Sequence, residues 1–356
     1  MSGETAVEAI YLERELVRVQ FPHCNLVSDH PVIMGGAGRG PSPGEIMMAA
    51  ITSASVFRAQ DEARRLGISA TSFVARSGMR ADRQGMNGPL HALAYLGRIW
   101  RRLEVTGPFE GDDAAIGVGV GVLETLRHGI ALEEEVSFDH NARRGAVAWK
   151  NETFLDIEHV VDDLADGATM IGEATGRWRA NAVLLDGETA LVETTGMPIV
   201  VSRVSGGRGP TPYELLLGSL ASCTAIYVGR NAQFAGIPLD RVSVIVTADC
   251  PDDLAEPIGQ MGKATRIAGQ LTAEEQEKCA FFAEYCALGE TLKRGADIVD
   301  DVALIAAEGA SARSVLSHLG RTAPLPIELQ CDDGTCCIPV APAGAAVPIA
   351  SGALGT

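Results

Sequence analysis

The chain has 356 residues, enough for two domains of ordinary size, and its 46% hydrophobic and 21% charged residues are typical of a soluble globular protein. A net charge of −17 without a basic cluster argues against nucleic acid or an anionic membrane as a partner. No apolar run approaches the ~20 residues that span a bilayer, and the N-terminus lacks the features of a signal peptide. We therefore expect a cytoplasmic protein whose eight cysteines are mostly reduced.

The first half of the chain opens with an extended region and continues into a helix. From Val17 onward, hydrophobic residues alternate with polar ones, which is typical of strands, and a glycine-rich turn follows at Gly35 and Gly36. The segment Gly38–Glu45 reads Gly-Arg-Gly-Pro-Ser-Pro-Gly-Glu, and its second proline stands where a helix begins. A long apolar helix is predicted from Ile46 to Leu66.

The second half follows the same order with more elements. Alternating hydrophobic residues predict its strands, and Thr272 with Glu275 forms a capping box that predicts the start of a helix. In chain order we predict strands at Arg177–Leu185, Thr189–Glu193 and Ile199–Val204, an apolar helix at Leu215–Ile237, strands at Arg241–Ala248 and Lys263–Leu271, a helix from Thr272 to about Arg294, and a strand at Asp297–Leu304.

Two segments of the chain occur twice in the same order. Gly207–Glu214 matches Gly38–Glu45 with an offset of 169 positions, and Gly289–Gly295 matches Leu123–Gly129 with an offset of 166. Such echoes indicate a duplicated domain. We predict an α+β fold in which each domain holds an antiparallel sheet and a long central apolar helix. The predicted divisions are a first domain at 1–140, a linker at 141–168, a second domain at 169–325 and a cysteine-containing, mostly disordered tail at 326–356.

Two cysteines of the second half are candidates for chemistry. Cys223 lies on the apolar helix, about three turns after Pro212, and Cys286 lies 63 residues further, in the next predicted helix. Buried cysteines are commonly inert. The helix dipole acts only within the first turn, so a reactive thiolate at Cys223 needs a cation nearby. Spacing alone leaves open whether the two thiols meet.

Several polar residues of the second half stand at fixed intervals from these cysteines. Arg203, the Gly-Arg-Gly-Pro turn at Gly207–Pro210, Glu214 and the cysteine pair follow one another in an arrangement that strongly resembles the OsmC/Ohr family of thiol-dependent hydroperoxide reductases. The resemblance covers about residues 170–305 in full and about residues 17–140 more weakly.

The resemblance implies four catalytic positions. Cys223 would be the peroxidatic cysteine and Cys286 the resolving one, while Arg203 would hold the thiolate and Glu214 would orient the arginine. An arginine stays cationic and lowers the pKa of a nearby thiol, and a carboxylate bonded to it fixes its direction. Cys223 would reduce a hydroperoxide to an alcohol, become a sulfenic acid and form a disulfide with Cys286. The expected partners are a small-molecule hydroperoxide and an external dithiol reductant of the lipoyl type, with no bound cofactor or metal.

The chain departs from the family pattern in both halves. Ala287 follows Cys286 where the family usually has proline. The first half has Met34 at the place of Arg203, Ala54 at that of Cys223 and Val120 at that of Cys286. Since family members are usually homodimers, the two domains would form an intramolecular pseudo-dimer with a degenerate first copy, one active site per chain, and a tandem chain that can itself form a homo-oligomer.

Two other functions fit the same scaffold, because fold does not fix function. One is another cysteine-dependent enzyme that acts on a non-peroxide electrophile. The other is a non-catalytic redox-sensing or ligand-binding protein. Near the tail, Cys331, Cys336 and Cys337 form an incidental cysteine-rich turn, a metal site or a thiol shuttle, and no histidine lies near to complete a zinc site. The remaining cysteines, Cys24, Cys250 and Cys279, are expected to be structural or inert.

Overall fold

The computed structural model describes residues 4–13, 15–30, 36–80, 98–109, 115–139, 178–194, 197–306 and 313–315. All of them belong to one compact unit, residues 1–323. The predicted linker at 141–168 and the predicted tail at 326–356 lie outside the described residues. Within the described residues, no helix is long and apolar enough to cross a membrane.

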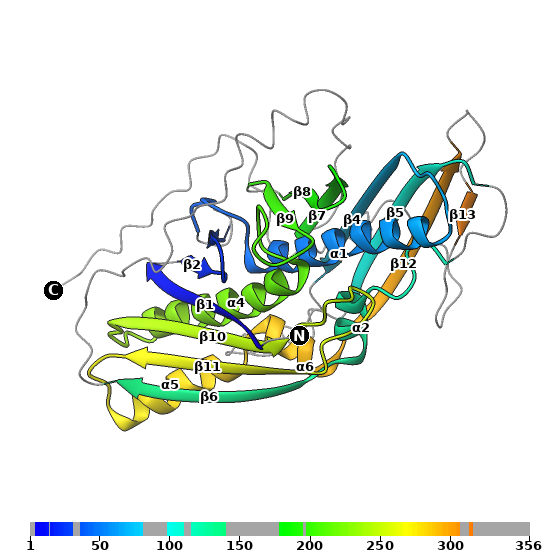
Figure 1. The fold of residues 1–356 in the computed structure, drawn as a ribbon. Coiled ribbons are helices and arrows are strands. Elements are labelled where there is room, and N and C mark those ends of the chain that lie inside the picture. The colour runs from blue at the N-terminus through cyan, green and yellow to red at the C-terminus, as the bar shows by residue number, and fades with distance from the viewer. Residues whose placement is uncertain are drawn as a thin grey trace, which may run out of the picture. The chain divides into compact units, whose positions relative to one another are not determined.

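Two mixed sheets form the framework of this unit (Figure 1). In the described part of the chain, the first sheet has six strands in the order β3-β2-β1-β10-β11-β6, and the second has seven in the order β13-β12-β5-β4-β7-β8-β9. The strands of the first sheet, in that order, are Asn25–Asp29, Leu16–Gln20, Glu4–Glu13, Arg241–Asp249, Gln260–Ala268 and Ala131–Asp139. Those of the second are Arg313–Val315, Asp297–Ala306, Arg98–Gly107, Ser72–Arg80, Trp178–Leu184, Thr189–Glu193 and Ile199–Ser202.

Each sheet takes strands from both halves of the chain, and this corrects the prediction of one antiparallel sheet per domain. In the first sheet β1 pairs antiparallel with β10, and β6 pairs parallel with β11. In the second sheet β4 pairs antiparallel with β7, and β5 pairs parallel with β12. Parallel neighbours need a long connection between them, and here the two strands of each parallel pair come from opposite halves. The predicted domain boundaries stay predictions.

Two long helices lie at the centre of the core and pack against each other. They are α1 (Pro43–Arg65) and α4 (Pro212–Phe234), each of 23 residues, which confirms the two predicted apolar helices. Each begins at a proline that follows a capping box, formed by Ser42 with Glu45 and by Thr211 with Glu214. Helix α1 packs on β4 and β7, whereas α4 packs on β1 and β10. Each helix therefore lies against strands of both halves.

Within the described residues the shorter helices are α2 (Gly121–His128), α5 (Ala273–Glu284) and α6 (Ala287–Arg294). The predicted capping box of Thr272 and Glu275 does begin α5. The prediction of one helix from Thr272 to about Arg294 is wrong, because the chain is extended at Cys286 and a new helix starts there. The side chain of Cys286 accepts a hydrogen bond from the N–H of Gly289 and so caps α6. The break places this sulfur at a helix N-terminus.

Candidate functional site

Cys223 lies on a half-buried stripe along α4. Most of the helix is fully buried, but Cys223, Tyr227 and Arg230 are each partly exposed. Residues separated by four and then three positions lie on one face of a helix, so these three side chains share a face. An aromatic ring and a cation therefore lie along the same half-buried stripe as Cys223.

Cys286 is fully buried at the N-terminus of α6. Its sulfur is 3.3 Å from the backbone nitrogen of Gly289 and 3.1 Å from the hydroxyl oxygen of Thr224 on α4. Ala287 is the first residue of α6, a position that tolerates proline because its N–H has no partner within the helix. Alanine in place of the family's usual proline therefore leaves the start of this helix intact.

The structure brings the two predicted thiols together. A hydrogen bond joins the side chains of Cys223 and Cys286, and the backbone of Leu288 in α6 also bonds the sulfur of Cys223. The bond to Cys286 and then burial raise the pKa of Cys223, while Leu288 and the charge of Arg230 lower it. The same bond lowers the pKa of Cys286; burial opposes this, and Lys263, Thr224 and Gly289 lower it further. Both pKa shifts favour the thiolate at Cys286 over the thiolate at Cys223.

Arg203 lies elsewhere. Its guanidinium forms an ion pair with Asp61 of α1, and among the described contacts none joins it to Cys223 or Cys286. The reason is the exchange of strands: β9, which ends at Ser202, belongs to the sheet that packs on α1. Asp61 follows Ala54 by seven positions, as Arg230 follows Cys223. The arginine thus meets the helix that has alanine in place of the thiol.

Glu214 serves the start of α4. Its carboxylate accepts hydrogen bonds from the backbone N–H of Thr211 and the hydroxyl of Ser205, each at 2.8 Å. These contacts make it the carboxylate of the capping box. No contact between Glu214 and Arg203 occurs among the described hydrogen bonds and ion pairs.

Arg230 is the cation that acts on Cys223, and the sequence analysis missed it. Its Nε atom lies 3.9 Å from Glu15, whose other oxygen is 2.8 Å from Nδ1 of His30. The guanidinium carbon also lies 5.8 Å from the centre of the Tyr227 ring, a cation–π distance. Glu15 and His30 belong to the first half of the chain. The signal that predicts Arg230 is its helical spacing of seven from Cys223.

Exchanging Arg230 for methionine should slow the alkylation of Cys223 by iodoacetamide at neutral pH about tenfold. Loss of one nearby opposite charge raises a thiol pKa by about one unit, and the thiolate is the reactive form. Peptide mass spectrometry of alkylated samples gives the rate at Cys223. The matched control is Arg203→Met, which removes an ion pair with α1 and should change the rate little. Equal slowing by both substitutions would contradict the assignment of Arg230.

The other described cysteines are not activated. Burial raises the pKa of Cys24 to about 12, and that of Cys250 and Cys279 to about 11. Their thiols therefore stay protonated at neutral pH. Met34, Cys331, Cys336 and Cys337 lie outside the described residues. Ala54 is buried on α1, and Val120 is the N-cap residue of α2 and makes no side-chain capping bond.

Fold and site together define an α+β protein with a hydrogen-bonded pair of cysteines between two helices. Residues 205–299 match the protein family described as OsmC-like protein. This part of the chain, which contains Glu214, Cys223 and Cys286, is an OsmC-like domain.

Further comparisons add little. A solved structure titled "structural genomics" is similar over 36% of this chain and 98% of its own, with 21% identity and a TM-score of 0.30. A similarity at that TM-score supports no inference about fold or function. No protein with a curated description matches the chain.

Proposed function

We propose that the protein reduces organic hydroperoxides to alcohols with the thiols of Cys223 and Cys286. The observation that carries this proposal is that the two side chains meet between α4 and α6, where Thr224, the residue after Cys223, lies 3.1 Å from the sulfur of Cys286. The half-buried Cys223 lies against the fully buried Cys286. Such an arrangement suits oxidation of the first thiol followed by disulfide formation with the second.

The proposed reaction has two steps before reduction. The sulfur of Cys223 attacks the outer oxygen of the hydroperoxide, the O–O bond breaks, and the departing alkoxide gains the thiol's proton to become an alcohol. Cys223 is then a sulfenic acid. The sulfur of Cys286 displaces its hydroxide, which becomes water on protonation, and a disulfide forms. An external dithiol of the lipoyl type restores both thiols by exchange.

Organic hydroperoxides are the proposed substrate class because the surroundings are apolar. Cys223 packs against the hydrophobic core. Leu220, three residues before Cys223, and Leu288, two residues after Cys286, are both buried. Transfer of an alkyl group from water to such a place lowers the free energy of the bound substrate. Hydrogen peroxide has no apolar group to transfer. The proposed place of action is the cytoplasm, where cysteines are kept reduced.

We also propose that the chain arose by tandem duplication and has one active site. The equal lengths and matching caps of α1 and α4 support a duplication. Ala54 and Val120 leave the first half without either thiol. In this proposal the first half completes both sheets and supplies Glu15 and His30 beside Arg230.

One stoichiometric pulse of an alkyl hydroperoxide should produce a single Cys223–Cys286 disulfide per chain. Peptide mass spectrometry under non-reducing conditions identifies the bond, and dihydrolipoamide should then be consumed in proportion to the peroxide added. The same pulse of hydrogen peroxide should oxidise the pair more slowly. A disulfide from Cys223 to Cys336 or Cys337 would transfer the resolving role to them. Absence of oxidation at Cys223 would remove the proposed function.

A further inference from the structure

A buried lysine lies on the strand next to the cysteine pair. Lys263 is on β11, and its side chain is only 1% exposed. Its ammonium group donates a hydrogen bond of 2.7 Å to the carbonyl of Ala283 near the end of α5, and it forms an ion pair with Glu134, which lies opposite on β6. A buried lysine is rare in proteins, because its ammonium group loses its hydration. Its charge therefore needs nearby groups that stabilise it.

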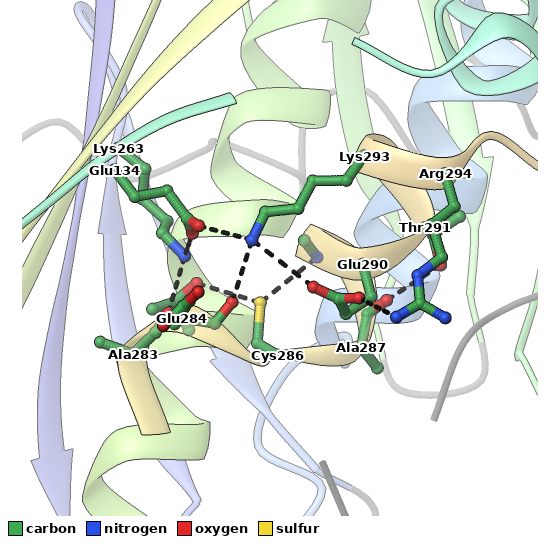
Figure 2. A network of polar contacts seen from close by, with 12 residues as sticks. Glu134, Lys263, Ala283, Glu284, Cys286, Ala287, Glu290, Thr291, Lys293 and Arg294 are labelled. Carbon is green, nitrogen blue, oxygen red and sulfur yellow. Dashed lines mark hydrogen bonds and ion pairs between the residues drawn. The ribbon is translucent and has the colours of Figure 1, made fainter. Parts of the chain in front are cut away.

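The charges around this lysine are shared unevenly (Figure 2). Glu134 also pairs with Lys293 of α6, at 2.5 Å. Glu290 pairs with Lys293 at 3.5 Å and with Arg294 at 2.6 Å. Glu134 is therefore shared by the ammonium groups of Lys263 and Lys293. Two ammonium groups on one carboxylate favour a further anion close to Lys263.

The sulfur of Cys286 is the group placed to be that anion. It accepts a hydrogen bond from the N–H of Gly289 at the N-terminus of α6, where the helix dipole favours negative charge. The hydroxyl of Thr224 and the thiol of Cys223 are donors from α4. A thiolate satisfies all three donors at once. The other polar groups near it are Tyr227 of α4, Lys263, Glu134, Glu290, Lys293 and the carbonyls of Ala283 and Glu284 at the end of α5.

A matching cation in the second sheet shows what happens where no thiol is present. Arg101 on β5 lies opposite Asp300 on β12, as Lys263 lies opposite Glu134. It is fully buried and binds Asp300 through two donors at 2.6 Å. Its remaining bonds go to the carbonyl of Gly117 at 2.9 Å and the hydroxyl of Ser55 at 3.2 Å.

The surroundings of Lys263 and Arg101 differ in the hydrogen bond that the neighbouring hydroxyl group makes. Ser55 on α1 occupies the place that Thr224 occupies on α4, one residue after Ala54 and Cys223 respectively. Ser55 bonds to the buried arginine, whereas Thr224 bonds to the sulfur of Cys286. The shorter side chain of lysine, with its single nitrogen, leaves the hydroxyl and the sulfur to each other. A buried lysine, which leaves the Thr224 hydroxyl bonded to the sulfur, thus occurs beside the thiols, and a buried arginine occurs where no thiol is present.

We propose that Lys263 is a positioning residue that keeps the sulfur of Cys286 anionic in the reduced protein, so that Cys286 accepts the proton of Cys223 during attack on the substrate. This inference rests on the proposed function. The lowered pKa of Cys286, caused first by the bond from Cys223 and further by Lys263, agrees with it.

The proton and electron balance follows from this assignment. As Cys223 attacks the outer peroxide oxygen, its proton passes across the S–H···S bond to Cys286, and from there to the departing alkoxide. Cys286 is then again a thiolate. It attacks the sulfenic sulfur of Cys223, the S–O bond breaks, and hydroxide leaves and gains a proton from solvent. Cys286 therefore resolves the sulfenic acid without a separate base.

The test is a titration of the full-length reduced protein by the ultraviolet absorbance of thiolates. The first midpoint of the coupled pair of Cys223 and Cys286, which Cys286→Ser should remove, is followed as the Cys286 titration. Lys263→Met should raise the midpoint of the Cys286 titration by about one pH unit or more. The double variant Lys263→Met/Glu134→Gln removes the carboxylate that the single change leaves without its lysine, and it should show the same rise. Lys263→Arg keeps the charge but can take the hydroxyl of Thr224, as Arg101 takes that of Ser55, so its midpoint should lie between those of the wild type and Lys263→Met. Arg101→Lys, at the matching place without a thiol, should change nothing.

Two outcomes would overturn the proposal. One is a folded double variant, checked by circular dichroism, whose Cys286 titrates as in the wild type. The other is a wild-type Cys286 that titrates in the ordinary thiol range of about 8.5. The titration is independent of turnover. A low Cys286 midpoint that depends on Lys263, in a protein without hydroperoxide reduction, would support the lysine's role and refute only the proposed function.

Discussion

Replacing Cys223 by serine should reduce the consumption of alkyl hydroperoxide to the rate measured without protein. A serine hydroxyl is not ionised at neutral pH and forms no disulfide, so both the attack and the resolving step are lost. Serine differs little in size, and Cys223 is half-buried on a helix whose capping residues and fully buried side chains are not changed. The fold should therefore persist, and circular dichroism can check it.

The assay for this variant is the oxidation of dihydrolipoamide after addition of an alkyl hydroperoxide. Cys24→Ser and Cys250→Ser are the matched controls, because burial keeps both thiols protonated and neither contacts Cys286 among the described interactions. Both should keep nearly the wild-type rate. Hydroperoxide reduction at the wild-type rate by Cys223→Ser would show that another group is the nucleophile.

Residues 165–356 expressed alone should aggregate or self-associate. This fragment lacks β1, β2, β3 and β6 of the first sheet and β4 and β5 of the second. Strand β10 then loses its partner β1, and β7 loses β4. Unpaired edges and the exposed core face of α4 are strong drivers of association. The same chain with residues 1–164 supplied as a second polypeptide should regain a discrete size.

Size-exclusion chromatography with light scattering measures this outcome. The single fragment should elute as large or multimeric species, and co-expression should yield a complex of one copy of each fragment. A stable monomer of residues 165–356 with full activity would falsify the view that the first half is a structural partner.

Local signals in the sequence were sufficient to predict the central helices. Proline after a capping box marks the start of α1 and α4, and both helices begin within three residues of the predicted apolar stretch. The strands β7, β8 and β10 were likewise predicted, because alternation of hydrophobic residues reports one buried face. Strand β1 was not predicted.

The arrangement of the strands could not be predicted in the same way. Alternation identifies a strand and its buried face, but it carries no information about the neighbour on either side. The pairing of β1 with β10 joins Glu4 to Asp249, far apart in the chain. The break before α6 was missed for a related reason. No glycine or proline marks it, and the extended residue is held by contacts of the Cys286 sulfur with Thr224 and Gly289.

For the candidate site, the meeting of Cys223 and Cys286 was the prediction that the structure supports most directly. The cations differ from the prediction, because the exchange of strands places Arg203 at α1. Arg230 and Lys263 carry weaker signals. One shares the helix face of Cys223, and the other takes an inward-facing position between Met261 and Thr265 on a strand. The sequence alone does not show that Lys263 is buried, because this requires knowing which face of β11 points into the core.

The pairing of Glu4 with Asp249 also affects how the chain folds during its synthesis on the ribosome. At a synthesis rate of ~5–20 residues per second, the N-terminal strand waits roughly 12 to 50 seconds before its neighbour has been made. During this time the apolar residues Val7, Ala9 and Ile10 have no partner strand on the β10 side. Contacts so distant along the chain slow folding. The first half therefore stays without this partner strand until the ribosome has made β10.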